Sequence, residues 1–286
     1  MGVKYPSVLF KERFMATSRR SFLAGTSALI AAVACSRAFG TTMGQLNPKK
    51  GLGGAAPGRS GLLTRWYYNW GAAPSHKGMP LANPAMQFFP MIWGWYPQKT
   101  PMVLQRLREQ HPSILLGYNE PDHKDQSNMT VETALETWPM FEGIASELVS
   151  PAAANARGPW MDKFMRGVEK KKLRVDSIAV HNYGPPSVEQ FLNILHDVHG
   201  LYQRPIWVTE FAVADWQAKH GAANRFSVDQ VAEFMQTACV EMDKIPWIKG
   251  YAWFPFAGKS SNALRTSVLF DADGNLNELG KVYARL

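Results

Sequence analysis

The sequence predicts an α/β fold, a (β/α)8 TIM barrel, and three observations support this prediction. Short and continuous apolar runs recur along the chain, as they do in parallel strands that are buried on both faces. Helical patterns stand between several of these runs, and such alternation requires parallel strands joined by crossovers. The ends of four consecutive runs are spaced by roughly 30 residues, which is the length of one βα unit.

The expected strands are the apolar runs that end in polar residues, Gly or Pro. They cover residues 65–70, 87–93, 114–118, 147–153, 177–183, 205–211, 248–256 and 267–270. Periodicity and capping residues predict helices over 100–110, 130–146, 159–171, 187–199 and 227–244. No Gly-x-Gly-x-x-Gly follows a strand, which disfavours a dinucleotide-binding sheet. Only two clear strands precede the one that ends at Glu120, so we expect a degenerate early βα unit, with its strand between Gly71 and Gln87.

Length and composition are those of one large globular domain. The chain has 286 residues, of which 46% are hydrophobic and 19% are charged. Most of the net charge of +8 lies in residues 1–40, and the remainder holds no long basic run. We therefore expect no nucleic-acid partner. We also expect a monomer.

Residues 1–40 are typical of a twin-arginine export signal. Arg19 and Arg20 precede an apolar stretch, Ala24–Ala34, that is too short to span a bilayer, so we expect no membrane span. This pattern predicts an exported protein, periplasmic or secreted. Met15 is a candidate for the true start. Lipid anchoring through Cys35 is the alternative fate of the leader.

Residues 41–61 are rich in Gly, Pro, Thr and Lys and indicate a linker or an N-terminal arm. The catalytic barrel is therefore expected to occupy residues 62–286. Cys239 is the only cysteine outside the leader, so this domain cannot form an internal disulfide.

Two of the predicted strands end in a glutamate, Glu120 and Glu210. In a barrel the reacting residues lie at the carboxyl ends of the strands. A carboxylate in such a place is costly to desolvate unless it has a partner or a chemical role. Glycoside hydrolysis uses two carboxyl groups, one protonated to assist the leaving oxygen and one ionised, and like charges in one site separate their pKa values. The pair therefore predicts a glycosidase.

The aromatic content favours the same class. Ten Trp residues exceed the ordinary needs of a core, and flat amphipathic rings stack on sugar faces. A Trp-rich core is the alternative.

The segments around the glutamates resemble a known group of enzymes. Residues 119–121 (Asn-Glu-Pro) and 209–211 (Thr-Glu-Phe) are similar to the acid/base and nucleophile segments of clan A glycoside hydrolases, retaining (β/α)8 enzymes whose glutamates follow strands four and seven. More narrowly, the chain from about residue 62 to its end resembles glycoside hydrolase family 128, the endo-β-1,3-glucanases. The segments that carry this resemblance are 68–71, 89–94, 117–122, 179–183, 207–212 and 251–254.

The resemblance implies a role for each site residue. Glu120 would be the general acid/base and Glu210 the nucleophile. Asn119 would hydrogen-bond the sugar 2-hydroxyl, and Tyr183 would hold the carboxylate of Glu210. His181 points the same way along its strand as Tyr183 and could line the cleft, with a hydrogen-bonded core histidine as the alternative. The expected sugar-stacking rings are Trp253, beside the scissile bond, and Trp70, Trp93 and Trp95.

The expected function is retaining endo-hydrolysis of β-1,3-glucan, with no cofactor and no metal. Two alternatives stay open. One is a retaining glycosidase that acts on another polysaccharide, and the other is a non-catalytic glucan-binding barrel.

Overall fold

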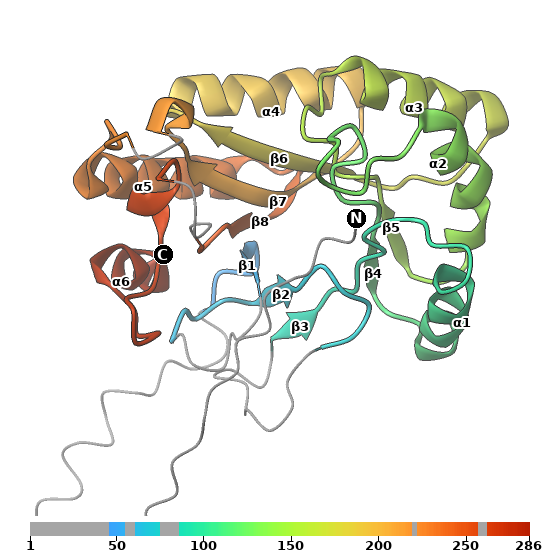
Figure 1. Ribbon diagram of the computed structural model, residues 1–286, viewed down its shortest axis with the longest axis horizontal. Coiled ribbons are helices and arrows are strands. Elements are labelled where there is room, and N and C mark those ends of the chain that lie inside the picture. The colour runs from blue at the N-terminus through green and yellow to red at the C-terminus, as the bar shows by residue number, and fades with distance from the viewer. Residues whose placement is uncertain (1–45, 55–60, 75–85, 219–221, 257–261) are drawn as a thin grey trace, which may run out of the picture. The chain divides into compact units, whose positions relative to one another are not determined.

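The computed structural model describes residues 46–54, 61–74, 86–218, 222–256 and 262–286 (Figure 1). The chain divides into two compact units, residues 1–42 and 43–286, and every described residue belongs to the second. The export signal predicted for residues 1–40 lies outside the described residues. Within the described part of the chain, no helix is both long and apolar enough to cross a membrane.

Strands and helices alternate along the described chain. The strands are β1 (Lys50–Gly53), β2 (Trp66–Tyr68), β3 (Gln87–Phe88), β4 (Ile114–Leu116), β5 (Glu147–Val149), β6 (Ile178–Gly184), β7 (Ile206–Val213) and β8 (Ile248–Trp253). The α-helices are α1 (Thr100–Gln110), α2 (Val131–Thr137), α3 (Pro159–Lys171), α4 (Val188–Tyr202), α5 (Val228–Lys244) and α6 (Glu278–Arg285). Short 3-10 helices are η3 (Trp138–Phe141), η4 (Trp216–Ala218) and η5 (Arg265–Ser267).

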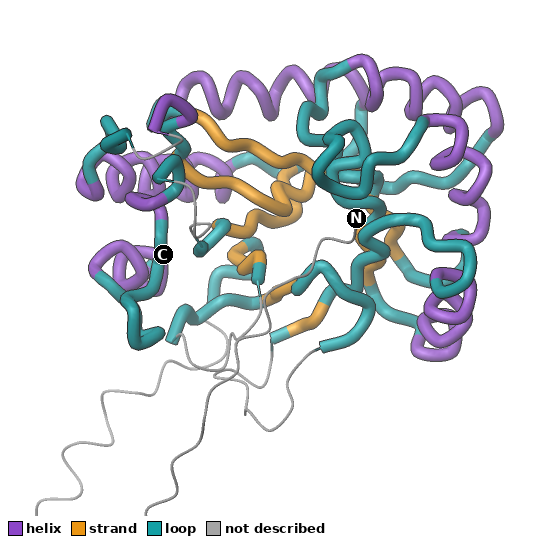
Figure 2. The backbone as a smooth tube through the Cα atoms, viewed as in Figure 1, coloured by secondary structure: helices purple, strands orange, loops and turns teal. Residues whose placement is uncertain are grey.

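The strands form a closed parallel ring. Six of them pair in the order β3-β2-β1-β8-β7-β6, and β4 pairs with β5. Single parallel bridges join the two sheets: Met91 pairs with Leu116, and Val149 pairs with Ser177. Helices lie outside the strands (Figure 2). The predicted α/β barrel is therefore confirmed.

The first strand of the barrel lies where the sequence predicted a linker. β1 pairs with β2 on one side and with β8 on the other, and all four of its residues are buried. The linker prediction is wrong for these residues. Their small side chains suggested a linker, but a strand enclosed by large aromatic neighbours can be buried without large side chains of its own. A Cβ on Gly51, for example, would lie 2.2 Å from the Trp66 ring.

β1 also supplies the strand that was missing before Glu120. With β1, β2 and β3 in place, Glu120 follows the fourth strand, as the clan pattern requires. Residues 71–74 contain no strand, and residues 75–85, the rest of the range in which a degenerate strand was expected, lie outside the described residues. In the described residues no helix follows β1 or β2, so these units are the reduced ones.

One helical prediction and one strand prediction need correction, and one helix was not predicted. The helix predicted over 130–146 ends at Thr137 and continues as the short η3, because Pro139 cannot donate a backbone hydrogen bond. Residues 267–270 form no strand beyond a single bridge from Phe270 to Leu276. The helix α6 was not predicted; the side chain of Asn277 caps it.

The core has two layers. An inner cluster fills the barrel, and Trp70 and Trp93 pack against its edge. The outer cluster fills the space between the strands and the helices. Alternate residues of each strand feed the two layers, so Ala179 and Trp207 point inward while Val180 and Val208 point outward. The inner cluster consists of Trp66, Tyr68, Phe89, Met91, Ile114, Leu116, Val149, Ala152, Ala179, Trp207 and Ala252.

Candidate active site

Glu120 lies just beyond β4, where the chain turns away from the barrel. Its backbone adopts φ 40°, in the left-handed region that residues with side chains rarely occupy. The segment is held by strand-like bonds, since Asn119 N donates to Trp93 O and Glu120 N donates to Ala152 O. Such a held, unfavourable conformation is characteristic of functional sites.

A β-bulge directs Glu210 into the barrel. On β7, Trp207 points inward and Val208 outward, so strict alternation would send the side chain at position 210 outward with Val208. The pairing of β6 with β7 instead shifts by one residue, and His181 lies opposite Glu210. The extra residue in β7 reverses the alternation at this point, as bulges near active sites do.

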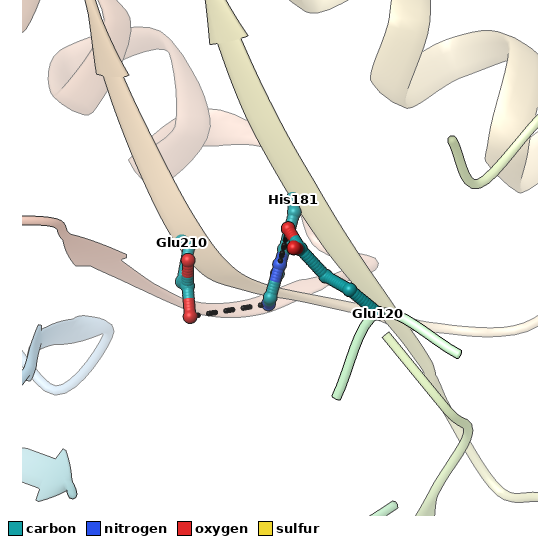
Figure 3. Close-up of side chains that lie close together, drawn as sticks. All are labelled: Glu120, His181 and Glu210. Carbon is teal, nitrogen blue, oxygen red and sulfur yellow. Dashed lines mark hydrogen bonds and ion pairs between the residues drawn. The ribbon is translucent and has the colours of Figure 1, made fainter. Parts of the chain in front are cut away.

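The side chains of Glu120 and Glu210 lie on opposite sides of the His181 ring (Figure 3). One carboxylate oxygen of each glutamate and one imidazole nitrogen of His181 all lie within 4.8 Å of one another. His181 Nδ1 is 3.0 Å from Glu120 Oε1, and Nε2 is 3.6 Å from Glu210 Oε1. No other trio of His, Cys, Asp or Glu in the described ranges converges in this way.

Three donors converge on the Glu210 carboxylate. Tyr68 Oη donates to Oε1 at 2.7 Å, and Trp70 Nε1 donates to the same oxygen at 2.8 Å. Tyr183 Oη donates to Oε2. These side chains come from β2, from the loop after β2 and from β6, so the closure of the barrel brings them together. Hydrogen bonds to a charged acceptor are the stronger ones, and this set fixes the carboxylate in place.

Glu120 and His181 shift each other's pKa values. Burial by itself would raise the pKa of Glu120, but the hydrogen bond and charge of His181 outweigh it, and the pKa lies below its ordinary value of 4.5. Burial would lower the pKa of His181, yet the charge of Glu210 and the bond to Glu120 raise it above 6.5. Burial and the charge of Glu210 hold the pKa values of Tyr68 and Tyr183 well above 10, so both remain hydroxyl donors.

Asn119 is buried beside this cluster. Its Nδ2 donates to Gln126 Oε1 at 3.2 Å, while its Oδ1 has no hydrogen-bond partner within the described structure. A buried amide oxygen without a partner is rare in native proteins and is suited to a ligand hydroxyl.

Of the predicted sugar-stacking rings, Trp70 and Trp93 lie at the inner cluster and Trp95 does not. Trp70 lies at the site as a hydrogen-bond donor to Glu210, which is a more specific contact than stacking. Trp93 is half-buried at the edge of the inner cluster and stacks on Tyr96. Trp95 packs against the outer core and not against the barrel interior.

The prediction that Trp253 lines the site is wrong. Trp253 is 0% exposed, packs in the outer core and donates its indole N–H to Ser267 O. Its neighbour Phe254 lies near the site instead, with ring centroids 5.9 Å from Trp70 and 5.6 Å from Tyr183. Successive residues of a strand point to opposite faces, so a prediction that is wrong by one position assigns a core residue to the site.

Tyr68 and Trp216 were not among the predicted site residues. Tyr68 shares the inward face of β2 with Trp66. The segment 68–71 also carries part of the family resemblance, so the sequence contained a signal for Tyr68. Trp216 is 47% exposed and its Nε1 donates to Tyr183 O at 2.9 Å. Its position after β7 gave no local sign that it would contact β6.

A parallel eight-stranded barrel with two adjoining glutamates, one after β4 and one in the second half of β7, has the site of a glycoside hydrolase. The family described as glycosyl hydrolase catalytic core matches residues 55–283. The chain belongs to this family and, within it, to glycoside hydrolase family 128.

Solved structures support this assignment. A family 128 (subgroup I) endo-β-1,3-glucanase from Amycolatopsis mediterranei, in complex with laminaritriose, shares 32% sequence identity and superposes with a TM-score of 0.70 over 84% of this chain and 99% of that one. A subgroup II endo-β-1,3-glucanase from Sorangium cellulosum shares 26% identity, with a TM-score of 0.66 over 82% of this chain and 97% of that one.

A curated relative is the alkali-sensitive linkage protein 1 of Schizosaccharomyces pombe, 28% identical over 228 residues. The match covers 76% of this chain but only 39% of that longer protein.

Proposed function

We propose that this glycoside hydrolase cleaves β-1,3-glucan internally and with retention of anomeric configuration, with Glu210 as nucleophile and Glu120 as general acid/base. The observation that carries the mechanism is the closeness of the two carboxylates, whose oxygens approach within 4.8 Å. Retaining enzymes hold their carboxyl groups about 5 Å apart, whereas inverting enzymes need roughly 6.5–9.5 Å to admit a water.

The proposed reaction has two steps. In the first, the Glu210 carboxylate bonds to the anomeric carbon while Glu120 gives a proton to the departing glycosidic oxygen. In the second, Glu120 takes a proton from water, the water oxygen bonds to the anomeric carbon and Glu210 leaves as a carboxylate.

The surrounding contacts support these roles. Tyr68, Trp70 and Tyr183 donate hydrogen bonds to Glu210 and so fix the position of the carboxylate that acts as the nucleophile. The unpartnered Oδ1 of Asn119 offers an acceptor to a sugar hydroxyl next to the reacting carbon.

The substrate class follows from the relatives. The Amycolatopsis enzyme is an endo-β-1,3-glucanase whose structure holds laminaritriose, and the present chain spans 99% of it. A β-1,3-glucan is therefore the substrate to test first, and another polysaccharide is the alternative.

The test is release of reducing ends from laminarin, with Glu210→Gln as the inactive variant and Glu109→Gln, an exposed position on α1, as the matched control. We expect activity in the parent and in the control, and none in Glu210→Gln. Tight laminarin binding without hydrolysis by the parent would favour a binding barrel. Hydrolysis of a different glucan alone would keep the mechanism and change the substrate.

We also propose that the protein is exported as a monomer through the leader in residues 1–40. The paired arginines and the short apolar stretch support export. We expect Arg19→Lys with Arg20→Lys to retain the protein inside the cell. Size-exclusion chromatography with light scattering tests the monomer.

A further inference from the structure

The imidazole of His181 lies between the two carboxylates with almost no exposure to solvent. Its side chain is 1% exposed, against 14% for Glu120 and 6% for Glu210. Nδ1 is 3.0 Å from Glu120 Oε1, a hydrogen bond, while Nε2 faces Glu210 Oε1 at 3.6 Å and has no closer partner in the described structure (Figure 3). Each ring nitrogen therefore faces one glutamate.

This geometry limits where the protons can be. A hydrogen bond needs a donor, and neither a carboxylate oxygen nor a bare ring nitrogen is one, so one proton lies between Nδ1 and Oε1. Nε2 also carries a proton, because its lone pair would otherwise point at a carboxylate oxygen. Two arrangements remain: an imidazolium beside an ionised Glu120, or a neutral imidazole beside a protonated Glu120. They hold the same protons and the same net charge.

We propose that His181 stores the proton that Glu120 delivers to the leaving oxygen, and that this proton moves from Nδ1 to Oε1 when a glucan covers the cleft. The proposal rests on the proposed function, in which Glu120 is the general acid. His181 acts through Glu120 and is a positioning residue for its proton.

The difference in burial gives the direction of the movement. In the uncovered site the pKa of Glu120 is lowered and that of His181 is raised, mainly because their bond and charges outweigh burial, so the proton lies on His181. Glu120 is the most exposed of the three groups, and a bound sugar removes its remaining water. Removal of water disfavours the charged pair relative to the neutral one, which transfers the proton to Glu120.

Other ionisable groups face this pair and bear on its titration. From the loop after β4, the charge of Asp122 acts on His181 and that of His123 acts on Glu120. From β7, the charge of Glu210 acts on His181. Tyr68 and Tyr183 stay neutral, because their pKa values are well above 10. The acidic neighbours favour retention of the shared proton, because their charges raise the pKa of His181.

The proton balance over a turnover closes. In the first step the Glu120 carboxyl gives its proton to the leaving oxygen as the glycosidic bond breaks and Glu210 bonds to the anomeric carbon. His181 is left neutral beside a Glu120 carboxylate, which is the base that the second step needs. That step returns one proton from water to Glu120 as Glu210 is released, and the pair regains its shared proton.

The first experiment uses His181→Gln, which keeps hydrogen-bonding ability and removes titration. In the parent the shared proton is held by an imidazole whose pKa is raised above 6.5, whereas in the variant only the Glu120 carboxyl can hold it, and burial raises the pKa of that carboxyl from 4.5. We therefore expect the basic limb of the kcat/KM profile to move toward acid by about one pH unit or more. At neutral pH, kcat/KM for laminarin should fall about 10²-fold or more. An aryl laminaribioside whose leaving group needs no proton should lose less than about tenfold. His196→Gln, an exposed change on α4, is the control and should match the parent.

An unchanged pH profile, together with equal losses on both substrates, would overturn the proposal. If His181→Gln fails to fold, ¹⁵N NMR of the histidine side chains in the parent decides the question. We expect an imidazolium signal from His181 at neutral pH that titrates at lower pH in Glu120→Gln. Identical titrations in the two proteins would rule the stored proton out. This measurement needs no turnover, so its failure is distinguishable from failure of the proposed function, which a parent inactive on every glucan would signal.

Discussion

Three hydrogen bonds from neighbouring side chains fix the carboxylate of the proposed nucleophile, Glu210. Tyr68 and Trp70 share Oε1 of Glu210, and Tyr183 takes Oε2. A hydrogen bond to a charged group contributes about 1.5–3 kcal/mol. Trp70 itself has φ 58°, so, like Glu120, it is held in a left-handed conformation. Such strain persists only where surrounding contacts compensate for it.

Removal of one donor should weaken catalysis without unfolding the protein. We expect Tyr68→Phe to lower kcat/KM on laminarin by roughly 10- to 100-fold, mostly through kcat, because the lost bond serves the reacting carboxylate and not the sugar. Steady-state kinetics measures this effect. Tyr202→Phe, which loses a bond to Ala156 O on the outer side of the barrel, should keep full activity. Equal activity in Tyr68→Phe and the parent would count against the role of Tyr68.

At the scale of single elements, irregular strands set the site. The bulge in β7 turns Glu210 inward, and the close approach of β4 to β5 positions Glu120. Gly117, between β4 and Asn119, makes that approach possible: a Cβ there would lie 2.8 Å from the backbone atoms of Ser150 and Pro151. Backbone atoms cannot rotate away from such a contact as a flexible side chain can.

Gly117→Ala should therefore separate β4 from β5 and displace Glu120. We expect a destabilisation of about 1–3 kcal/mol, typical of overpacking, together with a loss of kcat/KM. Thermal unfolding and laminarin hydrolysis report the two effects. Gly200→Ala on α4 meets nothing within 4 Å and is the matched control, expected to be neutral or slightly stabilising. An active Gly117→Ala protein with the parent's Tm would contradict this account.

At the scale of the whole barrel, β1 closes the ring and is tied to the last helix. Lys50 Nζ donates to Tyr283 O at 3.0 Å and to Ala284 O at 3.2 Å, at the carboxyl end of α6, where a cation complements the helix dipole. Tyr283 Oη in return donates to Gly51 O at 2.7 Å. β1 and the C-terminal helix therefore hold each other in place.

This arrangement predicts where the protein can be shortened. A chain that begins at Met43 should fold with a cooperative thermal transition and hydrolyse laminarin. A chain that begins at Leu62, where the sequence placed the start of the barrel, lacks the strand between β2 and β8 and leaves Lys50's partners on α6 unpaired. We expect it to aggregate or to melt without cooperativity. Circular dichroism of both proteins distinguishes the outcomes, and a folded, active Leu62 chain would restore the linker interpretation.

Local pattern in the sequence determined the succession of strands and helices, because apolar runs, caps and helical periodicity are properties of neighbouring residues. It also identified Glu120 and Glu210 as a pair, although Glu210 lies within β7 and not at its end. Tyr183 and His181 share a face because they are two residues apart on one regular strand, so their common direction could also be read from the sequence.

Only the tertiary structure decided the rest. β1 is a strand because β2 and β8 enclose it, and its own four residues, Lys-Gly-Leu-Gly, carry no signal of burial. Glu210 faces inward because a bulge reverses the alternation of β7, and Phe254 faces the site where Trp253 was expected. Which face a strand residue takes depends on register against a partner strand, and that register comes from contacts between residues far apart in the chain.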